Sequence, residues 1–172
     1  MALKDTLQQL NEKSNQPSFD REAFVKEWRD AVVRLHDQIR EFLDEYIDDG
    51  SISVLSISLV TLSEEALGNY QAPMMRLKAG PAIVEVKPVG RMIVGATGRV
   101  DLYRQGRTST NKRVIVLRVS YPPEEEKWEL VIPPKDRPFE LMGASDLAAS
   151  LKSQHLPFDK PNLELAIDRI LQ

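Results

Sequence analysis

The sequence predicts a single α+β domain in which helices come first, antiparallel strands follow, and helices return at the end. Two observations predict this class. Apolar residues recur at helical spacing near the start, and from residue 51 the spacing changes to the alternation typical of strands. The length of 172 residues suits one domain. We therefore expect one domain over 1–172, with 1–17 as a helical extension.

The strongest pattern is a long amphipathic helix over residues 20–49. Its apolar positions recur every three or four residues along the chain, as an apolar helical face requires. They are Phe24, Trp28, Val32, Leu35, Ile39, Phe42 and Tyr46. Asp20 is expected to cap the first turn, Phe19 and Phe24 to form a hydrophobic staple, and Gly50 to end the helix.

A shorter helix is expected before it, over residues 2–14. Leu3, Leu7 and Leu10 are four and three residues apart, so they share one helix face. Pro17 disfavours helix in the residue that precedes it. Two amphipathic helices joined by a short turn are typical of helical hairpins and intersubunit bundles.

An antiparallel meander of six or seven strands is expected after Gly50. Short apolar runs separated by glycine and proline turns, without helical patterns between them, predict this arrangement. The runs are 51–62, 70–78, 82–87, 91–94, 99–104, 113–121 and 128–132. The Val54–Leu55 doublet interrupts the alternation of the first run and predicts a bulge there.

Two short helices are expected at the C-terminal end. Ser145 can cap a helix that carries Leu147 and Leu151, and Pro157 breaks that pattern. Pro161 then suits the first turn of a second helix.

Charge is distributed unevenly along the chain. The net charge is −3 overall, but it is −5 over residues 1–50, +6 over 51–121 and −4 over 122–172. Either the acidic helices pair with a basic sheet inside the protein, or the basic middle faces a polyanion. Both interpretations stay open at this stage.

The residue types predict neither a cofactor nor a metal site. Without cysteine the chain has no disulfide, thiolate ligand or cysteine nucleophile. The two histidines, His36 and His155, lack paired ligand spacing, and no phosphate loop or nucleophile elbow is present. One motif, Glu85-Val-Lys87, resembles the strand-borne carboxylate and lysine of metal-dependent nucleases, yet only Glu64 and Glu65 precede it after Gly50. We identify no catalytic residue, and a nuclease or other hydrolase is the enzymatic alternative.

The start of the chain lacks the unbroken apolar region of a signal peptide. No run approaches the roughly 18–20 apolar residues that span a bilayer. We therefore expect a cytoplasmic protein without a membrane partner.

Two functional hypotheses follow. The first is a noncatalytic, homo-oligomeric protein-interaction or assembly subunit that uses its long N-terminal helix. Its interface candidates are Leu3, Leu7, Leu10, Trp28 and Val32. The second is a nucleic-acid-binding protein that uses a basic hairpin over 99–118. Its polyanion-binding candidates are Arg99, Arg104, Arg107, Lys112, Arg113 and Arg118.

Overall fold

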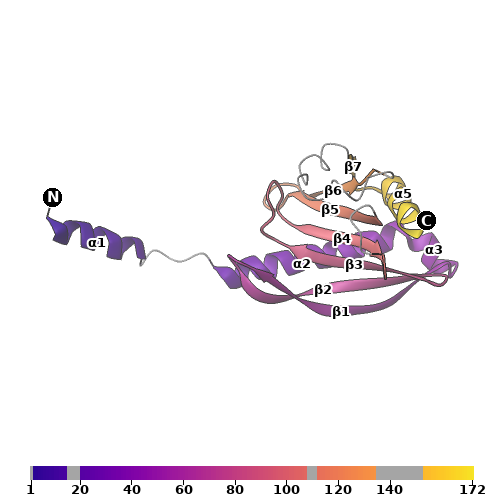
Figure 1. Ribbon diagram of the computed structural model, residues 1–172, viewed down its shortest axis with the longest axis horizontal. Helices are drawn as coiled ribbons and strands as arrows, with labels where there is room; N and C mark the ends of the chain where they lie inside the picture. Colours follow the sequence, from indigo (N-terminus) through magenta and orange to yellow (C-terminus); the bar gives the residue numbers. More distant parts are fainter. Residues whose placement is uncertain (1, 15–19, 108–111, 135–152) are drawn as a thin grey trace.

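The computed structural model describes residues 2–14, 20–107, 112–134 and 153–172. Its centre is one antiparallel sheet whose seven strands are neighbours in chain order, which confirms the predicted meander. The strands are β1 (Ile52–Glu64), β2 (Gly68–Ala79), β3 (Ala82–Gly90), β4 (Arg99–Arg104), β5 (Arg113–Ser120), β6 (Lys127–Ile132) and β7 (Gln154–Pro157). Helices and sheet together make an α+β architecture, with α2 lying across the sheet (Figure 1).

Among the described residues three helices precede the sheet, and the first two are α1 (Leu3–Ser14) and α2 (Arg21–Phe42). The predicted cap is confirmed, since the Asp20 carboxylate accepts a hydrogen bond from the Ala23 amide at 3.1 Å. Phe19, the other half of the predicted staple, lies outside the described residues.

The prediction of one continuous helix to residue 49 is wrong in one respect. α2 ends at Phe42, and a separate short helix, α3 (Asp44–Asp48), follows Leu43. Leu43 is buried in the core, whereas Phe42 packs against Phe158 with ring centroids 5.4 Å apart. Leu43 leaves helical geometry, with φ −101° and ψ 12°, and this local change divides the predicted helix into α2 and α3.

The strand predictions hold with one exception. The register shift between Val54 and Ser56 confirms the predicted bulge. Residues 91–94, predicted as a strand, instead form bends with a single isolated bridge. The reason is that the Glu64 carboxylate accepts hydrogen bonds from the Arg91 and Met92 amides, which a neighbouring strand would otherwise use.

The C-terminal end combines an unpredicted strand with a predicted helix. β7 pairs with β6, and α5 (Lys160–Leu171) follows with a proline in its first turn, as expected. The Asp159 carboxylate caps α5 by accepting from the Asn162 amide at 2.9 Å. The other helix predicted in this region, around Leu147 and Leu151, lies outside the described residues.

One hydrophobic core lies between the helices and one face of the sheet. Its buried residues come from α2 and α5 and from alternate positions of the central strands, such as Val84, Val86, Val100 and Leu102. The intervening positions, including Glu85, Asp101 and Tyr103, therefore point to the opposite face, which we call the second face.

Candidate interaction surfaces

α1 carries an apolar face that the described part of the protein does not cover. Leu3, Leu7 and Leu10 are exposed by 74, 53 and 57%, and α1 lies well away from the sheet (Figure 1). Removing such a face from water is favourable in proportion to its area. The three leucines predicted as interface residues are therefore available to a partner.

Trp28 and Val32, the other two predicted interface residues, are not available. Both are fully buried, and the Trp28 ring lies 6.2 Å from the Trp128 ring inside the core. An apolar stripe at helical spacing looks the same whether the chain's own sheet or another protein covers it. In α2 the chain's own sheet covers the stripe.

The predicted basic hairpin does not form one surface. On the second face, Arg99 and Arg113 bind the buried carboxylate of Asp101, with nitrogen–oxygen distances of 2.8 Å in both pairs. The Arg113 guanidinium also lies over the Tyr103 ring, 5.1 Å from its centre. These two arginines are therefore engaged by an acidic residue of their own sheet and not by an acidic helix.

Arg118 points to the other face and is fully buried. Its guanidinium donates to both carboxylate oxygens of Glu27 on α2, to Glu126, and to the Thr97 carbonyl. It also lies 5.3 Å from the Trp28 ring centre. Arg118 thus ties the long helix to the sheet, and it is inaccessible to a polyanion.

The remaining three candidates are dispersed. Arg104 donates to the Leu171 carbonyl at the end of α5, at 3.4 Å. Arg107 and Lys112 are exposed and flank 108–111, which lie outside the described residues. The basic side chains of the hairpin therefore lie in four different places. They do not form the continuous basic surface that the nucleic-acid hypothesis requires.

Glu85 of the nuclease-like motif has its own partners. Its carboxylate accepts from the Tyr103 hydroxyl at 2.6 Å and lies 3.4 Å from Arg76 Nε. Burial, together with the hydrogen bond to Glu85, raises the pKa of Tyr103 to about 12. Within the described ranges no three acidic or histidine side chains are grouped as a metal site requires. The environment of Glu85 is that of a carboxylate held by structural contacts.

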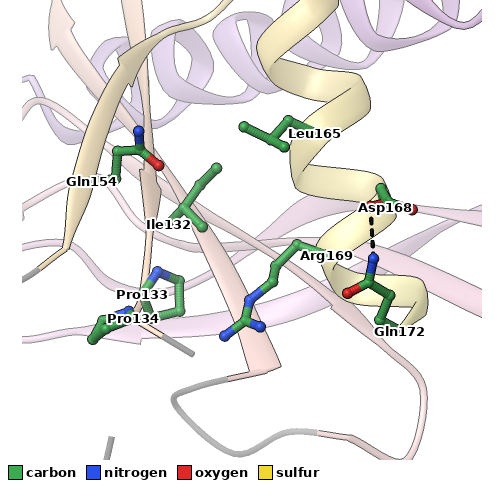
Figure 2. A pocket seen from close by; sticks show the side chains of 8 residues that line it. All are labelled: Ile132, Pro133, Pro134, Gln154, Leu165, Asp168, Arg169 and Gln172. Carbon is green, nitrogen blue, oxygen red and sulfur yellow. Dashed lines mark hydrogen bonds between the residues drawn. The ribbon is translucent and has the colours of Figure 1, made fainter. Parts of the chain in front are cut away.

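A surface pocket of about 310 Å³ lies between the ends of β6 and β7 and the helix α5. Figure 2 shows its lining: Ile132, Pro133, Pro134, Gln154, Leu165, Asp168, Arg169 and Gln172. The dashed line marks the 2.8 Å hydrogen bond from Gln172, the residue after α5, to Asp168 of α5.

The edge strand β1 exposes apolar side chains that the sequence reasoning did not select. Leu55, Ile57 and Leu59 are exposed by 47, 50 and 63%. Residues 52–63 contain neither a charge nor a proline. That absence over twelve residues was visible in the sequence, but only the strand order shows that this run lies at the sheet's edge.

No helix in the described part of the chain is long and apolar enough to cross a membrane. No family model matches the chain, and no curated protein or solved structure is found similar to it.

Proposed function

We propose that the protein is a noncatalytic assembly subunit whose helix α1 binds another protein. The observation that carries the proposal is the exposed row of Leu3, Leu7 and Leu10 on a helix that lies away from the folded domain. An amphipathic helix with anchors at positions i, i+4 and i+7 fits an apolar groove of a partner.

The rest of the chain supports a scaffold role for the domain. The Arg118 network and the Asp101 pairs are satisfied within the described residues. These charged side chains are thus occupied in holding the sheet and helices together. α1 differs because its apolar face has nothing to pack against in the described chain.

The partner's groove has a definable chemistry. The opposite side of α1 carries Asp5, Gln8 and Gln9, all exposed. On a helical wheel these residues lie away from the leucine row, because successive residues are about 100° apart. We therefore expect a groove that is apolar along its floor and polar at its rim.

The test compares two double variants of the full chain with the same added charge. Leu7→Asp with Leu10→Asp places two carboxylates on the apolar face, whereas Gln8→Asp with Gln9→Asp places them on the polar face. Native mass measurements of the tagged protein purified from its own cells should show a complex for the wild type and for the control. The leucine variant should lose that complex while its unfolding midpoint stays unchanged.

Two outcomes would overturn the proposal. One is a complex with a different protein that survives the leucine variant, because α1 would then not be the element that binds it. The other is a wild-type protein that is recovered alone, with no second protein at defined stoichiometry.

A further inference from the structure

We propose that the uncharged edge strand β1 pairs with β1 of a second copy, so that two sheets join into one across a two-fold axis. This inference concerns a different surface from α1 and does not rest on it. It starts from the strand order, in which β1 is an outermost strand of the sheet.

An outermost strand has backbone N–H and C=O groups that point away from the sheet and can pair with another strand. Natural sheets block such pairing with charges, prolines, bulges or very short edges. β1 is thirteen residues long, and its residues 52–63 carry neither charge nor proline. Its one bulge lies near its start, between Val54 and Ser56, and the register from Ser56 to Glu64 is unbroken.

The side chains also favour association. Ile57 and Leu59 are each at least half exposed and, as alternate residues, share one face of the strand. Ser56 and Ser58 alternate with them. Such a strand is apolar on one face and uncharged on the other, so a neighbouring strand meets no electrostatic penalty on either face.

Of the two edge strands of the sheet, β1 of a second copy is the better pairing partner for β1. The opposite edge, β7, has only four residues and ends at Pro157, so it offers a poor match to the long β1. Pairing of β1 with β1 is self-complementary, because each copy presents the same uncharged strand. A two-fold axis closes the assembly at two copies, whereas pairing of β1 with β7 would continue into a filament.

The symmetry restricts the register. In an antiparallel pair related by a two-fold axis perpendicular to the sheet, one residue must lie opposite its own copy. We place Ser58 at this axis. Ile57 of each copy then lies opposite Leu59 of the other copy. The two most exposed apolar residues of the strand would thus cover each other.

The mass of the full-length protein, measured by sedimentation equilibrium over a concentration series, tests the pairing. We expect a dimer for the wild type. Leu59→Lys should shift it to monomer by raising the dissociation constant at least tenfold, since lysine is a natural blocker of edge pairing. The matched control is Val119→Lys, because Val119 is also exposed but lies on β5 inside the sheet. The control should remain a dimer.

The register has an independent test because the chain contains no cysteine. Ser58→Cys should form a disulfide-linked dimer under mild oxidation, since opposite residues of such a pair lie within disulfide reach. Ser56→Cys should not, because its copies would be four residue steps apart, or about 13 Å.

Each remaining outcome counts against the proposal. A wild-type monomer at all concentrations, or a mass that keeps rising beyond two copies, overturns closed β1 pairing. Retention of the dimer in Leu59→Lys, together with its loss in the α1 variant Leu7→Asp with Leu10→Asp, would assign self-association to α1 instead. Crosslinking of both cysteine variants to the same extent would overturn the register.

Discussion

Acidification is expected to destabilise this protein through one buried histidine, His36. The side chain is 1% exposed, and its Nε2 has no hydrogen-bond partner within the described residues. Burial, reinforced by the nearby positive charge of Arg40, lowers the pKa of His36 from 6.5 to about 4. The folded protein therefore resists placing a charge there.

The sign and size of the effect follow from proton linkage. Well above pH 6.5 the histidine is neutral in both states, so it adds no pH dependence. Between pH 6.5 and pH 4 the unfolded chain binds a proton that the folded chain excludes, so stability falls as pH falls. With these pKa values, the loss is about 2 kcal/mol at pH 5 and levels off near 3 kcal/mol below pH 4.

The assay is urea unfolding of the wild type and of His36→Leu at pH 7.5 and pH 5. The leucine variant keeps the apolar contacts of the site but cannot take up a proton. Other groups titrate in both proteins and affect both equally. Between pH 7.5 and pH 5 the free energy of unfolding should therefore fall by about 2 kcal/mol more in the wild type than in the variant. Equal losses in the two proteins would refute the assignment of this pH dependence to His36.

Two further predictions concern the contacts that hold α2 on the sheet. Replacing Glu27 by Gln removes a carboxylate from the buried guanidinium of Arg118 and should lower the free energy of unfolding by about 2–4 kcal/mol. The control Asp30→Asn breaks the exposed pair with Lys26 and should change the free energy of unfolding by less than about 1 kcal/mol. Equal effects of the two variants would contradict a stabilising role of the Glu27–Arg118 pair. Gly98→Ala would place a Cβ 2.2 Å from the Trp28 ring and should cost about 2–4 kcal/mol. The control is Gly95→Ala, where φ is +77° but the added Cβ has no atom within 4 Å. It should cost only about 1–2 kcal/mol of backbone strain. Thermal unfolding of the two variants would show the difference in stability.

Much of the secondary structure could be predicted because its causes are local. The Asp20 cap, the first turn of α5 with its proline, and the bulge after Val54 all depend on residues within a few positions of one another. The seven-stranded meander follows from short strands and tight turns. The local pattern failed at residues 91–94, because the backbone amide of Arg91 donates a hydrogen bond to the Glu64 carboxylate, 27 positions earlier in the chain.

The surfaces could be predicted only in part, because exposure is a property of the assembled fold. The apolar rows of α1 and α2 look alike in sequence, but the sheet buries Trp28 and Val32 and leaves Leu3, Leu7 and Leu10 exposed. The basic residues of the hairpin are likewise close in sequence, but strand alternation sends Arg113 and Arg118 to opposite faces, each toward an acidic group.

By itself, the sequence determined the class of the fold, the cap and approximate extent of the long helix, and the order of most strands, since these depend on periodicity and neighbouring residues. Tertiary structure alone decided which apolar rows are covered, which charges are paired, and that the uncharged β1 run lies at an edge. The physical reason is that burial, charge pairing and edge position depend on contacts between residues distant in the chain, and no local pattern encodes those contacts.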